Sequence, residues 1–333
     1  MKKLFILVNV ALGVLACSGK NDPTNPDKPS GATIEGELTG AFSVGASKKV
    51  HFSQGNLQYQ ASTETWKFAR DQNHYVGSSA EPSSTYAGWI DLYCWGASGY
   101  NDRYPYINLN EYYRDIEDAL QTDICGTNYD WGVYNKISNG GNEAGLWRTL
   151  TDEEWQYIFL KRKDAEYLFG LGRVNGVNGL IILPDDWNTP TGLTFTPSVT
   201  KGWVWKDTRK RYSNGAKYII MEGDFRYGYY NNNSDANNYN DNIYTSTEWS
   251  LMENAGAVFL PSSIDGDTYR FPEAIGIFGQ YWSSTFFMVY RGDPNGSCGC
   301  YLSFSENSIC FTSGGIVLDQ GMTGAVRLVR DVE

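Results

Sequence analysis

The stretch Ile277-Phe278-Gly279-Gln280-Tyr281-Trp282-Ser283-Ser284-Thr285 decides how the rest of the chain is arranged. Aromatic and β-branched residues dominate it and a glycine marks its start, which is typical of a strand in a buried sheet. A second stretch of this kind, Ala325-Val326-Arg327-Leu328-Val329-Arg330, lies near the C-terminus. We predict that the two stretches are core strands of one sheet.

Between these stretches the sequence predicts an antiparallel hairpin. Its first arm runs from Cys298 to Phe304 and its second from Ile309 to Phe311. If Glu306-Asn307 is the turn, Phe304 faces Ile309 and Leu302 faces Phe311, so that one face of the hairpin is apolar and half-buried.

Composition sets the broad class of the protein. The chain has 333 residues, 41% of them hydrophobic, which is enough to bury a core in one large domain or two ordinary ones. The 24 tyrosines and 11 tryptophans against only 2 histidines favour an aromatic binding surface over a centre built on imidazole. The net charge of -11, with no compensating basic stripe, excludes nucleic acid as a partner.

The N-terminus has the pattern of an export signal. Two lysines follow Met1, an apolar run extends from Leu4 to Leu15, and Ala16 precedes Cys17. The run is too short to span a bilayer as a permanent helix. Its end resembles a bacterial lipobox, which implies cleavage after residue 16 and a lipid on Cys17. The alternative is an ordinary secretory signal in which the cysteine has no role.

We therefore expect residues 1–16 to be a lipoprotein signal peptide and residues 17–40 a flexible tether rich in proline, asparagine and aspartate. Residues 41–333 would form the folded domain. The expected location is the outer membrane, through the lipid on Cys17, facing either the periplasm or the cell surface.

The chain has five further cysteines. Because this number is odd, at least one of them is a free thiol or forms a disulfide with another molecule in an exported protein. They are Cys94, Cys125, Cys298, Cys300 and Cys310. One interpretation is a disulfide between Cys94 and Cys125. The other is that the cysteines are small, buried hydrophobic residues.

Two short helices and several strands are predicted around this core. Thr151 and Glu154 form a capping box that opens a helix through Leu160, and the neighbouring Asp152 and Glu153 suit a helix N-terminus better than a catalytic site. A second helix is expected over residues 248–255, a short one near residues 113–120, and strands over residues 176–184 and 256–261. The Asn/Asp-rich tract from about residue 185 to 247 is expected to be an irregular excursion.

Two loops combine aromatic rings with amides, which is the chemistry that holds sugars or peptides. They extend from Tyr86 to Tyr113 and from Phe225 to Tyr244. The alternative is that these rings fill gaps in a loop-rich fold. The candidate ligand-binding residues are Trp89, Tyr93, Trp95, Tyr100, Tyr104, Tyr106, Tyr229 and Tyr230.

Four pieces together resemble a known family. They are residues 147–155, 256–261 and 279–284, with the closing stretch 326–330. They resemble the Fibrobacter succinogenes major paralogous domain, which occurs among surface lipoproteins of Bacteroidetes-type bacteria. That group is similar in turn to the C-type lectin-like fold, which formylglycine-generating enzymes also use. The resemblance implies an α+β, C-type lectin-like fold with mixed and antiparallel sheets, two short helices and long irregular loops.

The same resemblance frames the chemistry that we expect. Calcium-dependent lectins bind the calcium ion with a loop and a Trp-Asn-Asp strand. In this sequence Asp293-Pro294-Asn295 offers Asp293 and Asn295 as candidate metal ligands, but the Trp-Asn-Asp strand is missing. Formylglycine-generating enzymes hold copper on a cysteine pair, and Cys298 and Cys300 lack the family's longer spacing. We expect no resident cofactor and no catalysis, only the binding of a glycan or protein ligand. The alternatives are an oxidase on this scaffold and a structural or fimbria-associated envelope component.

Overall fold

The computed structural model describes most of the chain from residue 34 to residue 332. The described residues are 34–75, 77, 83–106, 120, 122–198, 203–205, 210–213, 219–222, 228–230, 238–262, 276, 278–288, 297–306, 308–311 and 323–332. Cys17, Asp293, Asn295 and most of the short helix expected near residues 113–120 lie outside them, so those predictions stay predictions.

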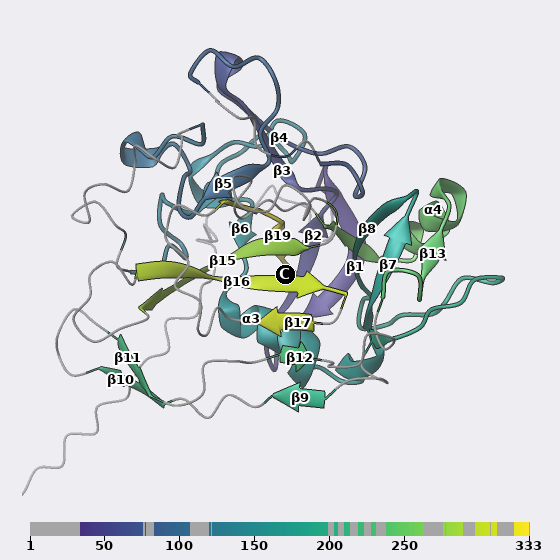
Figure 1. Ribbon diagram of the computed structural model, residues 1–333. Helices are drawn as coiled ribbons and strands as arrows, with labels where there is room; N and C mark the ends of the chain where they lie inside the picture. The colour runs from purple at the N-terminus through teal and green to yellow at the C-terminus, as the bar shows by residue number, and fades with distance from the viewer. Residues whose placement is uncertain are drawn as a thin grey trace, which may run out of the picture.

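The described part is a mixed α+β structure made mostly of strands (Figure 1). The largest sheet, which we call the central sheet, has seven strands in the order β5 (Leu92–Cys94), β18 (Thr323–Ala325), β15 (Gly279–Met288), β16 (Ser297–Ser305), β17 (Ser308–Phe311), β12 (Gly228–Tyr230) and β9 (Trp203–Trp205).

Two further sheets have four strands each. The first has the order β1 (Glu37–Ser43), β2 (Lys49–Ser53), β19 (Leu328–Asp331) and β6 (Arg148–Thr149). The second has the order β13 (Ile243–Tyr244), β7 (Phe169–Val174), β8 (Val177–Ile182) and β14 (Val258–Pro261). Two-stranded ribbons are formed by β3 (Leu57–Gln60) with β4 (Thr65–Phe68), and by β10 (Lys210–Ser213) with β11 (Ile219–Glu222).

The helices are short. They are α2 (Trp131–Tyr134), α3 (Asp152–Gln156), continued by the wider turn η4 (Tyr157–Lys161), and α4 (Ser246–Asn254), with single turns at η1 (Ala61–Thr63), η2 (Tyr100–Asp102) and η5 (Ala165–Tyr167).

The capping box predicted for α3 is confirmed. The Thr151 hydroxyl accepts from the Glu154 N–H, and the Glu154 carboxylate accepts from the Thr151 N–H. The buried side chains Trp155, Ile158 and Phe159 hold the helix against β15, β16 and β17 (Figure 1). Helix α4 opens with an equivalent box that the sequence reading missed, formed by Thr245 and Glu248.

The hairpin register is confirmed as well. Leu302 pairs with Phe311 and Phe304 with Ile309, while Ser305 stands opposite Ser308 next to the turn. Leu302, Phe304 and Ile309 are all buried, so the apolar face of the hairpin is part of the core.

The two stretches predicted to be strands of one sheet are only partly so. Ala325 on β18 pairs in parallel with Tyr281 on β15, but Leu328–Asp331 crosses into the first four-stranded sheet as β19. The chain turns between them because the Val326 carbonyl accepts from the Leu57 N–H at 2.9 Å and the Arg327 side chain is directed into the interior. The single predicted strand is therefore two strands in two sheets.

The domain begins earlier than expected. Residues 37–40, predicted to belong to the tether, are the first half of β1. Leu38 and Phe42 are buried on one face of this strand, and Glu37 accepts two hydrogen bonds from the Arg330 guanidinium at 2.7 and 2.8 Å. This burial and pairing make the segment part of the fold, and they bring the first and last strands onto the same sheet.

The tract from about residue 185 to 247 is less irregular than predicted. Five short strands, β9 to β13, lie within it, and β12 extends the central sheet by pairing with β17. Backbone pairing with neighbouring strands supplies order that an Asn/Asp-rich composition alone does not indicate.

Candidate ligand-binding surface

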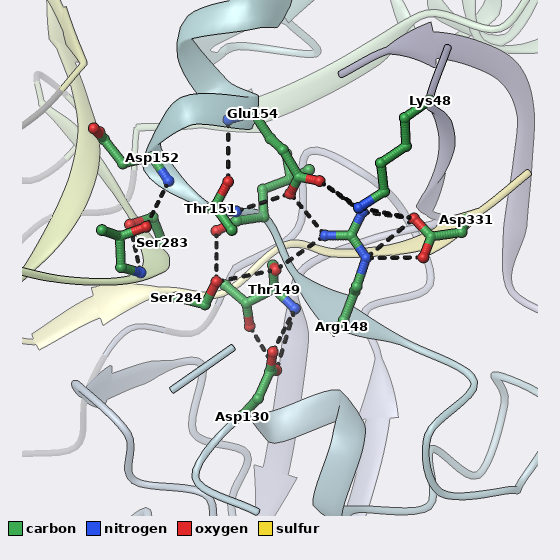
Figure 2. A network of polar contacts seen from close by, with 12 residues as sticks. Lys48, Asp130, Arg148, Thr149, Thr151, Asp152, Glu154, Ser283, Ser284 and Asp331 are labelled. Atoms are coloured by element: carbon green, nitrogen blue, oxygen red, sulfur yellow. Dashed lines mark hydrogen bonds and ion pairs between the residues drawn. The ribbon is translucent and has the colours of Figure 1, made fainter. Parts of the chain in front are cut away.

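A network of polar contacts joins α3 to the strands around it (Figure 2). The Arg148 guanidinium makes a two-pronged ion pair with Glu154, at 2.7 and 3.0 Å, and a second one with Asp331, the closest distance being 2.6 Å. Lys48 Nζ lies 2.8 Å from the same Glu154 carboxylate. Because Arg148 and Glu154 are buried, these charges stabilise the fold only while all of them are present.

The lower part of the network is held by Asp130. Its carboxylate accepts from the Thr149 N–H and hydroxyl, the latter at 2.8 Å, and from the Gly132 N–H at the start of α2. Burial raises the pKa of Asp130 to about 6, against the lowering effect of these hydrogen bonds. Asp130 thereby anchors α2 to β6.

The charged groups of this network are paired with one another and with the backbone. Neighbouring strands and helix ends are joined by the carboxylates of Asp130 and Glu154 and by the Arg148 guanidinium. In addition, the Asp152 N–H donates to the Thr285 hydroxyl at 3.0 Å. Glu154 therefore takes part in helix capping and ion pairing, and the Asp152 carboxylate accepts from the Gln156 amide at 2.8 Å.

A second buried polar centre surrounds Arg327. Its guanidinium donates to Gln72 at 2.7 Å and to Asn56 at 3.5 Å, and Nε has no hydrogen-bond partner among the residues that the structure describes. Asn56 in turn donates to the Tyr281 hydroxyl. Burial lowers the pKa of Arg327 to about 10, so the group keeps its charge at neutral pH. The arrangement uses neutral amides to solvate a buried cation.

Two of the predicted ligand-binding residues belong to the core instead. Tyr93 and Trp95 are both 0% exposed. The Tyr93 hydroxyl donates to the carbonyls of Ile90 and Leu57, and Trp95 Nε1 donates to the Ser283 carbonyl at 2.8 Å. Their polar atoms are therefore used inside the protein, and the proposal that they contact a ligand is wrong.

Trp89 lies half-buried, with the Lys67 ammonium 3.7 Å from the centre of its ring. This cation–π contact covers part of the ring. Tyr229 and Tyr230 are on β12, opposite Ile309 and Ser308 of β17, and the placement of their rings lies outside what the structure describes, so the prediction for these two residues stays a prediction.

The remaining three predicted residues form two groups of rings with two others: Tyr100 with Tyr129 and Tyr134, and Tyr104 with Tyr106, which follows on the same loop. We call Tyr100, Tyr104, Tyr106, Tyr129 and Tyr134 the tyrosine surface. Tyr104 and Tyr134 are 39% and 42% exposed, and the other three are half-buried. Rings of this exposure can receive a flat ligand while remaining fixed at their inner edges.

The rings of the tyrosine surface support one another. Tyr100 meets Tyr129 and Tyr134 edge-on, with centroids 5.1 and 5.3 Å apart. Tyr104 stacks on Tyr106 at 5.3 Å and an angle of 17°. These geometries are the ones that aromatic pairs prefer, so the rings are held in place before any ligand arrives.

The loop that carries three of these tyrosines is shaped by residues that accept left-handed backbone angles. Gly99, Asn101 and Asp102 have φ values of 91°, 51° and 61°. The loop is fastened to the segment before α2 by the Ser98 hydroxyl, which donates to the Asn128 carbonyl at 2.7 Å. It is fastened to the C-terminal end of α2 by Asn135, which donates to the Ser98 carbonyl.

Carboxylates border the tyrosine surface. The Tyr104 hydroxyl donates to Asp102 at 2.6 Å, and this hydrogen bond raises the pKa of Tyr104. Burial together with the charge of Glu64 raises the pKa of Tyr106 and raises that of Tyr59 to about 12. The negative charges of Asp102 and Glu64 therefore act on the Tyr104–Tyr106 pair.

Tyr129 and Tyr134 were missed by the sequence reading. The signal that could have found them is Asp130, an N-cap residue immediately after Tyr129 that starts the short helix ending at Tyr134. A capped turn between two tyrosines brings both to one side of the helix.

The cysteines resolve one open alternative. Cys125 is disulfide-bonded, whereas Cys94 and Cys300 are buried thiols. A Cys94–Cys125 bridge is therefore wrong, and the interpretation of buried hydrophobic residues is confirmed for Cys94 and Cys300.

Within the described ranges, no group of three or more His, Cys, Asp or Glu side chains is placed to hold a metal ion. The helices of this same part of the chain are too short and too polar to cross a bilayer. Comparison with protein-family models, curated proteins and solved structures finds no match to this chain.

Proposed function

We propose that the protein is an exported, lipid-anchored envelope protein whose folded domain binds a glycan through the tyrosine surface without catalysing a reaction. The observation that carries the proposal is the exposure of Tyr104 and Tyr134, each of which packs against a neighbouring tyrosine ring. Fixed aromatic faces bordered by carboxylate and amide groups suit sugar rings, which offer apolar faces and hydroxyls together.

The export part of the proposal is supported by the apolar run before Cys17 and by the disulfide at Cys125. Disulfides persist in oxidising compartments and are rare in the cytosol. The lipid on Cys17 would hold the protein at the outer membrane, on its periplasmic or outer face.

The finer fold assignment is also a proposal, namely a C-type lectin-like domain related to the Fibrobacter succinogenes major paralogous domain. It is supported by the capped helix α3 packed on the central sheet and by β19 pairing with β2 near the start of the domain. The split between β18 and β19 departs from the prediction that the two core stretches lie in one sheet.

Glycan-array binding by the intact protein tests the proposed function. We expect selective binding to a subset of glycans, reduced about fivefold or more by Tyr104→Ala or Tyr134→Ala, because truncating an anchor ring costs more than about 1 kcal/mol of binding free energy. Tyr167→Ala is the matched control, since Tyr167 is 53% exposed on η5 and belongs to no part of the tyrosine surface.

Circular dichroism of each variant checks that the fold is retained. Equal, weak signals across the whole array, or binding that Tyr104→Ala and Tyr134→Ala leave intact, would refute the proposed function. Selective capture of a protein with no glycan attached would assign the surface to a different ligand class and refute it as well.

A further inference from the structure

We infer that the tyrosine surface selects uncharged glycans and rejects glycans that carry carboxylate or sulfate groups. This inference concerns the ligand class of the same surface and rests on the function proposed above.

The geometry of the acidic groups is the first step. Asp102 is on the same loop as Tyr104 and its carboxylate lies within hydrogen-bond distance of the phenol, at 2.6 Å. A sugar stacked on Tyr104 would place its hydroxyls near this carboxylate, which accepts hydrogen bonds and cannot donate them. A sugar carboxylate at the same place would set two acceptors of like charge against each other.

Glu64 contributes the second charge from a different element. It is exposed at the end of η1, with a left-handed φ of 51° that turns the chain into β4. Its charge contributes to the raised pKa values of Tyr59, Tyr104 and Tyr106. Three tyrosine hydroxyls therefore experience Glu64, although only two of them belong to the tyrosine surface.

The cation of the tyrosine loop does not offset these charges at the surface. Arg103 is the single Lys or Arg within residues 98–106. Its side chain is buried, donates to the Trp95 carbonyl and lies with its guanidinium carbon 5.9 Å from the centre of the Tyr129 ring. An acidic ligand would approach the outer side, where the carboxylates lie. The chain's net charge of -11 adds repulsion at longer range.

The test compares oligosaccharides that differ only in oxidation at C6. We would measure binding of the intact protein to β-1,4-linked hexamers of mannose and mannuronate, glucose and glucuronate, and to α-1,4-linked hexamers of galactose and galacturonate. In whichever pair of hexamers binds, we expect the protein to have a higher affinity for the neutral hexamer than for the acidic one. Glu64→Gln should then raise the affinity for the acidic member by about three- to fivefold, the effect of one unit charge at short range in water.

Glu166→Gln is the matched control for the charge change. Glu166 is an exposed carboxylate beside the exposed Tyr167, outside the tyrosine surface, and its removal changes the net charge equally. It should leave the preference unchanged. Raising the salt from about 0.01 to about 1 M should also improve binding of the acidic member to the unmodified protein, and less so to the Glu64→Gln variant.

The outcomes separate the two proposals. Binding that depends on Tyr104 but shows equal or higher affinity for the acidic members would overturn this inference and leave the proposed function standing. An equal response of Glu64→Gln and Glu166→Gln would also overturn it. Absence of binding to every hexamer and to the glycan array would overturn both.

Discussion

Replacing Gln72 with leucine should destabilise the fold more than replacing the buried Arg327 with methionine. The oxygen of Gln72 accepts from Arg327 at 2.7 Å and from the Phe259 N–H at 2.8 Å. Its amide nitrogen donates to Glu253 at 2.8 Å and to the Ala257 carbonyl at 3.0 Å. Leucine fills the same volume but removes all four hydrogen bonds.

The magnitude follows from what each variant leaves unpaired. A buried cation that loses its main acceptor costs about 3–5 kcal/mol, and each unsatisfied buried backbone group costs about 1–3 kcal/mol. These costs overlap, so we expect about 4 kcal/mol for Gln72→Leu. Arg327→Met removes the charge together with its desolvation penalty, and Gln72 keeps three of its four bonds, so we expect a loss below about 1.5 kcal/mol.

Urea unfolding followed by tryptophan fluorescence measures both free energies. Gln54→Leu is the control, because Gln54 makes one long side-chain hydrogen bond, 3.3 Å to the Ala69 carbonyl, and should cost under about 1 kcal/mol. In the double variant, Gln72→Leu should cost about 2 kcal/mol less than it does alone, since no charge is left unpaired. A cost for Gln72→Leu no larger than that of Arg327→Met, or additive costs, would refute this account of the buried cation.

Three further changes test other parts of the structure. Glu154→Ala should cost about 4 kcal/mol because it leaves the buried Arg148 with Asp331 alone, whereas Thr151→Ala should cost about 1 kcal/mol as a lost cap; comparable values in urea unfolding would contradict the network in Figure 2. Burial raises the pKa of Asp130 from 3.8 to about 6, so the folded protein holds this proton more tightly than the unfolded chain does. Its contribution to stability is therefore greatest below about pH 4 and falls by about 3 kcal/mol as the pH rises through 6. Asp130→Asn should remove this part of the pH dependence. If the free energies of unfolding of the two proteins change with pH in parallel, the assignment to Asp130 is wrong. Trp95→Ala should lower the free energy of unfolding by about 4 kcal/mol, as expected for a ring in the core, and this loss should appear as a lower melting temperature. Normal stability together with lost ligand binding would show that Trp95 is a surface residue after all.

Local signals in the sequence were sufficient for α3 and for the β16–β17 hairpin. The reciprocal bonds of Thr151 and Glu154 depend only on residues three apart, and the register of Phe304 with Ile309 depends only on the turn between them. Both follow from short-range geometry that any surrounding fold must respect.

The path of the C-terminal stretch could not be predicted in this way. Its pattern from Ala325 to Arg330 reads as one continuous strand, yet the chain leaves the central sheet after Ala325. The turn depends on Gln72 and Asn56, the acceptors of Arg327, which are more than 250 residues earlier in the chain. Long-range partners of this kind leave no mark in the local pattern.

The candidate surface could be predicted only in part, because the direction of a ring also depends on long-range contacts. The clustering of aromatic residues after Tyr86 singled out Tyr100, Tyr104 and Tyr106, which are partly exposed in the structure, but composition does not distinguish a ring that faces solvent from one that faces the core. Tyr93 is on a strand of the central sheet and Trp95 follows that strand directly, so both rings point inward. The distinction requires the strand pairing and not the residue type.

The first strand of the domain also has a mechanical consequence. β1 is an outer strand of its sheet, paired on one side only with β2 and fastened by Glu37 to Arg330 and by Ser43 to Asp185. Any pull that reaches the domain through the residues before Ile34 enters at this strand. Detachment would begin at the Glu37 end, where the pairing register shifts before Ala41, and the force needed to start it would depend on the Glu37–Arg330 clasp.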